Sequence, residues 1–124
     1  MKIYSGECLC GPVRLSARGE PQRVGICHCT NCRRESGSAF TYCRVWPAHP
    51  FEHSGATSEF RGQHSCRQCG SPAFSVSDQE AEIKLGLLAE APTSLEPSYE
   101  LWVKRREPWL GVVAGAEQHQ EDRK

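Results

Sequence analysis

Apolar and polar residues alternate in several short stretches of the chain. The alternation is clearest over residues 13–18, 81–88 and 99–104. A period of two places successive side chains on opposite faces of an extended chain, so these stretches predict half-buried β-strands. Other short stretches rich in β-branched or aromatic residues predict further strands over residues 22–26, 38–46, 51–61 (two strands around a turn) and 73–77.

One stretch breaks this pattern. Residues 30–36 are polar and have no period of two, and Gly37 follows them where a helix commonly ends in a left-handed residue. We expect about one turn of helix there. The chain also contains 11 Gly and 8 Pro, which favours short strands joined by turns over long helices. The pattern predicts an all-β (mainly β) fold of many short strands, with at most one or two short helical turns.

The length and the charge limit the domain count and the partners. A chain of 124 residues is long enough for one domain, which we expect over residues 1–113. Residues 114–124 are polar without an apolar period, so we expect a mobile tail. Fifteen basic and fifteen acidic residues cancel, whereas phosphate binding normally needs a basic excess, so nucleic acid is not an expected partner.

No apolar run has the length of a membrane span, and the first residues lack the apolar core of a secretion signal. We therefore expect a cytoplasmic protein with no membrane partner. The eight cysteines then favour metal binding over disulfides, because the cytosol is reducing. Cys66 and Cys69 bracket a tight turn before Gly70, which is the usual form of a zinc knuckle.

Seven of the eight cysteines occur in clusters, and Cys43 stands alone. A structural zinc takes four protein ligands, whereas a catalytic zinc takes three and keeps one position open. One partition gives a closed site from Cys8, Cys10, Cys66 and Cys69. It leaves an open site from Cys27, Cys29 and Cys32.

The spacing also permits a second partition. Two CxxC pairs could form a zinc ribbon from Cys29, Cys32, Cys66 and Cys69. This would leave Cys8, Cys10 and Cys27 for another site. The cost of loop closure does not separate the two, because it is small beside the binding energy of structural zinc.

The chain resembles the glutathione-dependent formaldehyde-activating enzyme family, which includes centromere protein V, over about residues 6–109. The resemblance lies in the ordered motifs Gly6-x-Cys8-x-Cys10-Gly11, Cys27-His28-Cys29-x-x-Cys32-Arg33, Gly37-Ser38-x-Phe40 and Cys66-x-x-Cys69-Gly70. It implies a small, twisted, zinc-stapled β domain with two zinc ions per chain. It selects the first partition, with a structural zinc on the four cysteines and a catalytic zinc on Cys27, Cys29 and Cys32.

The resemblance further implies a carbon–sulfur lyase activity that joins formaldehyde to glutathione as S-hydroxymethylglutathione. Three thiolates make zinc a weak Lewis acid but a good partner for another thiolate. The hypothesis is that a thiol such as glutathione occupies the open position while formaldehyde or another small aldehyde approaches. The alternative is a non-catalytic zinc-stapled β module that binds another protein.

Other residues near the open cluster have two interpretations each. His28 is a candidate proton shuttle, or it packs and hydrogen-bonds behind the ligands. Arg33 and Arg34 are candidates for binding carboxylates of the thiol, or they form a solvated helix face. Gly37 and Ser38 line the approach of the substrate, or they form only a turn and a cap. Cys43 is a small buried residue, or it completes the second metal shell.

Overall fold

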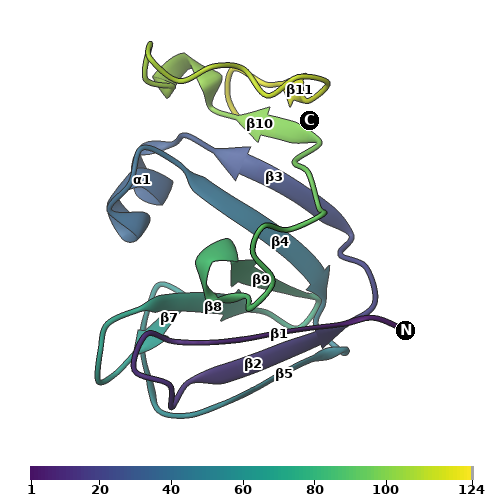
Figure 1. Ribbon diagram of the computed structural model, residues 1–124. Coiled ribbons are helices and arrows are strands. Elements are labelled where there is room, and N and C mark those ends of the chain that lie inside the picture. Colours follow the sequence, from purple (N-terminus) through teal and green to yellow (C-terminus); the bar gives the residue numbers. More distant parts are fainter. Residues whose placement is uncertain (124) are drawn as a thin grey trace. The chain divides into compact units, whose positions relative to one another are not determined.

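We describe residues 1–123 of the chain in a computed structural model, which contains two compact units. Unit 1 is Met1–Gln22 with Arg44–Thr93, and unit 2 is Arg23–Cys43 with the chain from Ser94 onward. The two units share strand β4 (Thr41–Pro47), whose first three residues belong to unit 2 (Figure 1). A single domain over residues 1–113 stays a prediction.

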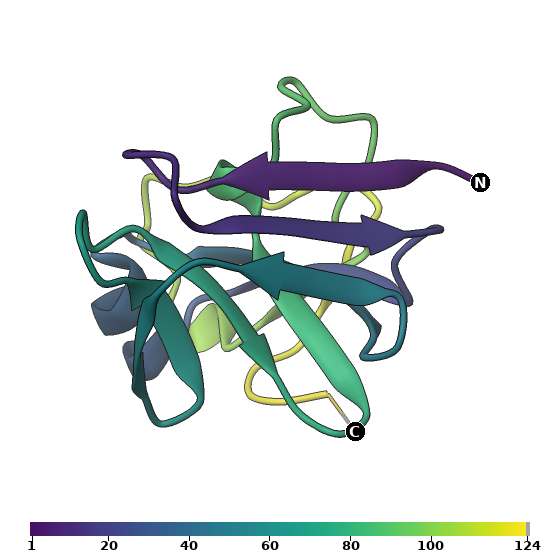
Figure 2. The ribbon, with the colours of Figure 1, turned by 90° about the horizontal axis from the view of Figure 1, so that it is seen from below.

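Unit 1 contains a three-stranded antiparallel sheet with β2 in the centre (Figure 2). Its strands are β1 (Ile3–Glu7), β2 (Arg14–Arg18) and β5 (Phe51–Ser54). Strand β2 confirms the alternation over residues 13–18, since Leu15 and Ala17 are buried and Arg14 is exposed. Strand β1 was not predicted, because only Tyr4 of its five residues is buried.

Unit 1 also contains four consecutive strands that pair antiparallel with their neighbours. They are β6 (Thr57–Phe60), β7 (Gln63–Cys66), β8 (Pro72–Val76) and β9 (Glu80–Lys84). The rings of Phe51 and Phe74 lie 5.2 Å apart and connect β5 with β8. Phe74, Trp46 and Ile83 are fully buried and form much of the core of this unit.

The strand expected over residues 81–88 is shorter than predicted. It ends at Lys84, and Leu85–Leu87 form a single 3-10 turn, η1. The turn lets Leu88 bridge to Gly6 of β1, and the backbone N–H of Ala89 donates to the carbonyl of Ser5 at 2.9 Å. The alternation of apolar and polar residues over 81–88 does not predict this pairing, because the partner segment is distant in sequence.

Unit 2 is built around strand β10, which pairs in parallel with a strand on each side. Its elements are β3 (Arg23–Cys27), α1 (Thr30–Ser36), β10 (Tyr99–Leu101), the 3-10 turn η2 (Val103–Arg105) and β11 (Glu117–Gln118). Helix α1 confirms the expected helical turn, and Gly37 ends it in the left-handed region at φ 65°. With η1 and η2, the described residues contain three helical segments, one more than we expected.

The segment that we expected to be a polar mobile tail carries β11. The backbone N–H of His119 donates to the carbonyl of Glu100, and that of Trp102 donates to the carbonyl of Glu121. The segment therefore has backbone partners around β10, although Lys124 lies outside the described residues. Its mobility stays a prediction.

The prediction of an all-β fold is confirmed, since strands predominate and α1 is the one α-helix of the described residues. Among residues 1–123, no helix is long and apolar enough to cross a membrane.

Candidate metal sites and an adjoining basic pocket

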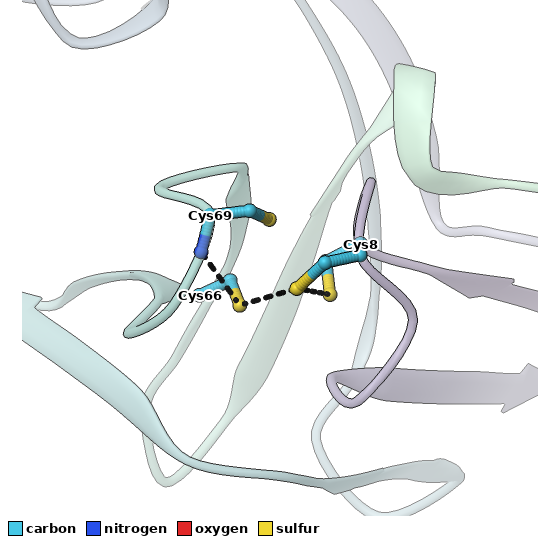
Figure 3. Close-up of side chains that lie close together, drawn as sticks. Cys8, Cys66 and Cys69 are labelled. Carbon is cyan, nitrogen blue, oxygen red and sulfur yellow. Dashed lines mark hydrogen bonds between the residues drawn. The ribbon is translucent and has the colours of Figure 1, made fainter.

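The first group of thiols lies in unit 1 and contains four cysteines whose Sγ atoms all lie within 4.8 Å of one another. They are Cys8, Cys10, Cys66 and Cys69. Cys66 ends β7 and Cys69 lies in the turn that follows, whereas Cys8 lies on a separate segment after β1 (Figure 3). The structure thus brings together the four residues of the first partition, and not the zinc ribbon of the second.

The spacing of these thiols fits a tetrahedral zinc ion. The Sγ atom of Cys10 lies 3.8 Å from that of Cys8 and 3.6 Å from that of Cys66. Four sulfurs at a Zn–S distance of 2.3 Å are separated by about 3.8 Å. The donor set is therefore that of a closed structural site.

Backbone amides support the sulfurs of this group. The N–H of Cys69 donates to the Sγ of Cys66 at 3.4 Å, and the N–H of Val13 donates to the Sγ of Cys8 at 3.3 Å. Such donors favour the thiolate that a metal requires. The N–H of Gly70 donates to the carbonyl of Cys66 and closes the turn of the knuckle.

The thiols of this group differ in acidity. The hydroxyl of Ser71 lies 3.1 Å from the Sγ of Cys69 and, with the backbone of Ser71, lowers the pKa of that thiol to about 5. Desolvation, with hydrogen bonds to Cys69 and Cys66, raises the pKa of Cys10 to about 12. A metal ion bound by all four sulfurs would displace the protons that they carry.

The second group of thiols lies in unit 2 and contains Cys27, Cys29 and Cys32, whose Sγ atoms also lie within 4.8 Å of one another. Cys27 ends β3, Cys29 caps the N-terminus of α1, and Cys32 lies within α1. Among the described residues, no fourth His, Cys, Asp or Glu belongs to the group, and Cys43 and His28 lie outside it.

The two groups use the same turn. The N–H of Cys32 donates to the Sγ of Cys29 at 3.3 Å, as the N–H of Cys69 does to that of Cys66. The N–H of Arg33 donates to the carbonyl of Cys29 at 3.0 Å, and the chain then continues into α1. A hydrogen bond to Cys27 and burial raise the pKa of Cys32. Three close sulfurs are the donor set of an open zinc site.

His28, which lies between two of these cysteines, is 2% exposed. Its Nε2 lies 2.8 Å from the Oε1 of Glu100, which is 1% exposed. Sequence reasoning missed Glu100, because alternation in residues 99–104 places it on the polar face. The partners of its side chain, among them Val113 and Gln118, are distant in sequence, so no local pattern marks Glu100 as buried.

A pocket of about 570 Å³ adjoins α1 in unit 2. It is lined by Thr30, Arg33, Arg34, Ser38, Lys104 and Arg105. Three of the four residues predicted to contact the substrate, Arg33, Arg34 and Ser38, line this pocket. The fourth, Gly37, is absent from the lining and is the C-cap of α1. Sequence reasoning missed Thr30, Lys104 and Arg105, of which Lys104 was assigned to the end of a strand.

The cations of the pocket have different surroundings. Arg33 donates to Glu107 Oε2 at 2.6 Å, and Lys104 forms an ion pair with Glu121. Within the described residues, Arg34 has no hydrogen bond or ion pair. The guanidinium of Arg105 lies 5.7 Å from the ring of Trp102. The pocket therefore offers positive charge that its own acidic neighbours neutralise only in part.

One family model matches most of the chain. The family model described as glutathione-dependent formaldehyde-activating enzyme matches residues 3–105. The chain is similar to an uncharacterized lyase of Schizosaccharomyces pombe, with 33% identity over 79 residues. That match covers 60% of this chain and 58% of the relative, so the chain spans less than two thirds of that protein.

A solved structure shares the fold. The crystal structure of a Rhodobacter sphaeroides protein superposes with a TM-score of 0.55 and 18% sequence identity. The match covers 71% of this chain and 91% of the other.

Proposed function

Because this chain belongs to the glutathione-dependent formaldehyde-activating enzyme family, we propose that it is a zinc-dependent enzyme of the lyase kind. It forms or cleaves the carbon–sulfur bond between a thiol, such as glutathione, and formaldehyde or another small aldehyde. The observation that carries the proposal is a group of three thiols at the N-terminus of α1, without a fourth protein ligand among the described residues, while a basic pocket adjoins the same helix. The lyase name of the S. pombe relative supports the reaction type.

The proposal assigns one zinc ion to each group of thiols. The four cysteines of unit 1 would hold a structural ion, and Cys27, Cys29 and Cys32 would hold the other. A zinc ion bound at the three-cysteine site supplies positive charge that favours the thiolate form of a substrate thiol. The backbone N–H of Cys32 supports this arrangement by donating to Cys29 Sγ.

The pocket residues bind and orient the substrate. Glutathione carries two carboxylates, and guanidinium groups bind carboxylates through paired N–H donors. Arg34 and Arg105 supply such donors, and Lys104 adds a point charge. The side chains of Thr30 and Ser38 line the same pocket and can donate or accept hydrogen bonds.

The reaction needs no oxidant or reductant. The thiolate sulfur attacks the aldehyde carbon, a C–S bond forms, and the electron pair of the C=O π bond moves to oxygen, which takes a proton from water. In reverse, the hydroxyl loses its proton, the C=O bond reforms and the thiolate departs. By holding the thiol in one orientation, the pocket lowers the entropic cost of the encounter.

Steady-state kinetics with two thiols test the proposal. We expect Arg34→Ala and Arg105→Ala each to raise KM for glutathione about 10-fold, the value of one charge-assisted hydrogen bond. Neither should change KM for uncharged 2-mercaptoethanol. Arg14→Ala, an exposed arginine of β2, is the matched control and should change neither.

Exchange NMR of a mixture of glutathione and formaldehyde measures the rates at which the adduct forms and breaks down, first without the enzyme and then after its addition. The wild type should accelerate formation and breakdown of the adduct, and Cys29→Ala should not. If the wild type leaves the exchange rate at the uncatalysed value for every thiol and aldehyde tried, the proposal is wrong.

A further inference from the structure

A single buried carboxylate connects the three-cysteine loop with the C-terminal segment. Glu100 lies on β10, between β3 and β11, and is 1% exposed. Burying a carboxylate is costly unless hydrogen bonds replace its hydration. Each oxygen of Glu100 has such partners, and they come from different parts of unit 2.

The first oxygen faces the cysteine loop. Glu100 Oε1 lies 2.8 Å from Nε2 of His28, the residue between Cys27 and Cys29. The backbone N–H of His28 also donates to the carbonyl of Leu101 at 3.0 Å, and its ring lies 5.9 Å from the ring of Phe40. Strand β10 therefore fixes both the backbone and the side chain at the middle of the Cys-x-Cys sequence.

The second oxygen faces the C-terminal segment. Glu100 Oε2 accepts from the backbone N–H of Val113 at 3.0 Å and from Nε2 of Gln118 at 2.9 Å. Nη1 of Arg106 lies 3.6 Å from the same oxygen. Burial alone would raise the pKa of Glu100, but the hydrogen bonds from His28, Val113 and Gln118 hold it below its usual value.

The ionised carboxylate determines which nitrogen of His28 carries hydrogen. A carboxylate only accepts hydrogen bonds, so Nε2 of His28 must donate to it. In the neutral ring, Nδ1 then keeps its lone pair. Nδ1 is buried and has no hydrogen-bond partner among the described residues, so the hydrogen bond to Glu100 is the one polar contact that orients the ring.

We propose that Glu100 is a positioning residue that sets the geometry of the three-cysteine site through His28 and couples that geometry to residues 113–118. Its consequence for catalysis rests on the proposed function. Residues that hydrogen-bond to a metal ligand usually contribute about 10- to 100-fold to metal affinity. Glu100 does not contact a ligand itself but holds His28, the residue between the ligands Cys27 and Cys29. The same carboxylate thus adds two hydrogen bonds to the contacts between β10 and residues 113–118.

Glu100→Gln is the variant that tests this role, because the amide matches the carboxylate in shape. An amide has one acceptor oxygen and one donor nitrogen, whereas three donors face Glu100. If the amide oxygen of the substituted side chain accepts from Val113 and Gln118, its NH₂ group faces Nε2 of His28. Because NH₂ is a donor, Nε2 must then accept, and the neutral ring carries its hydrogen on Nδ1. Gln118→Ala removes one donor from the far oxygen and is the milder variant, used also if Glu100→Gln fails to fold.

The measurement uses the full-length protein with cobalt in both sites, together with zinc affinity by chelator competition. We expect Glu100→Gln to weaken the second ion about 10- to 100-fold and to change its cobalt spectrum, leaving the four-cysteine ion unchanged. Gln118→Ala should weaken the affinity for the second ion and change its cobalt spectrum in the same direction as Glu100→Gln, but to a smaller extent. Long-range ¹H–¹⁵N spectra should show His28 with hydrogen on Nε2 in the wild type and on Nδ1 in Glu100→Gln.

Glu117→Gln is the matched control, since this carboxylate on β11 is 75% exposed and contacts only His119 among the described residues. It should leave both ions unchanged. A Glu100→Gln protein that keeps the wild-type affinity and spectrum at the second site would overturn the inference while leaving the proposed function intact. A wild-type protein that binds one ion would overturn the proposed metal site itself.

Discussion

Cys29 and Cys66 occupy the same place in two similar turns, yet the chemistry that we propose for them differs. Each accepts a hydrogen bond at Sγ from the cysteine three residues later. Cys66 and its partner join two cysteines from the start of the chain, whereas Cys29 and its partner join only Cys27. The number of thiols that meet at each turn, and not the turn itself, separates a closed site from an open one.

Single cysteine substitutions should therefore have unequal effects. We expect Cys66→Ser to remove the structural ion and unfold the protein, because structural zinc contributes about 10–16 kcal/mol to folding. Cys27→Ser should lose one ion and stay folded. Elemental analysis gives the ions per chain, and circular dichroism gives the folded fraction.

The control for these substitutions is Cys43→Ser, because Cys43 is buried in β4 but belongs to neither group. It should keep two ions per chain. Equal unfolding of Cys27→Ser and Cys66→Ser would show that both sites are structural and would favour the non-catalytic module.

Strand pairing brings the ends of β3 and β10 together, and this places the cysteine loop against Glu100. Gly25 of β3 lies directly opposite Tyr99 of β10. A Cβ atom at position 25 would lie 2.2 Å from Cε2 of the Tyr99 ring. The absence of a side chain at Gly25 is thus a condition for this pairing.

Gly25→Ala should therefore lower the free energy of unfolding by about 1–3 kcal/mol, the usual cost of an overpacked core. Urea denaturation followed by tryptophan fluorescence measures the change. Gly111→Ala is the control, since a Cβ there meets no atom within 4 Å, and it should change stability by less than about 0.5 kcal/mol. Equal stability of the two variants would contradict the close packing of β3 on β10.

Aromatic rings connect β5 with β7 and β8 in unit 1. His53 lies 4.5 Å from the ring of Phe74 and 6.5 Å from that of His64. Burial, and then the charge of His64, lower the pKa of His53 below its usual value of 6.5. The unfolded chain binds this proton more tightly, so protonation costs folding stability as the pH falls below 6.5.

An NMR titration of the imidazole protons tests this packing. The midpoint of His53 should lie below 6.5, and it should rise toward 6.5 in Phe74→Leu, which removes a ring that packs against His53. A midpoint at or above 6.5 in the wild type would contradict the contact between β5 and β8.

Local patterns predicted much of the fold but not its edges. Alternation of apolar and polar residues identified β2, β9 and β10, although both faces of β10 are buried at Tyr99 and Glu100. It missed β1, β7 and β11, because these strands have few buried residues and pair with segments distant in sequence. It also extended one strand through Leu85–Leu87, where the chain turns to reach β1.

At the scale of the whole molecule, the spacing of cysteines defined the clusters but left their partition open. The structure brings Cys8 and Cys10 beside Cys66, more than 50 positions away, and this contact separates the two partitions. The pocket was predicted only where its residues neighbour the cysteines in sequence. Lys104 and Arg105 were not predicted as lining residues, because about 70 residues separate them from α1 and no local sequence pattern indicates that they lie beside it.

The central claim is that a thiol binds at the three-cysteine site, and a titration of the cobalt-substituted protein with glutathione tests it most directly. We predict sulfur-to-cobalt charge-transfer absorbance that rises and saturates with glutathione in the wild type. Cys27→Ser, which keeps only the four-cysteine site, should show no such rise. A wild-type protein loaded with two cobalt ions whose spectrum stays unchanged up to millimolar glutathione would contradict the claim.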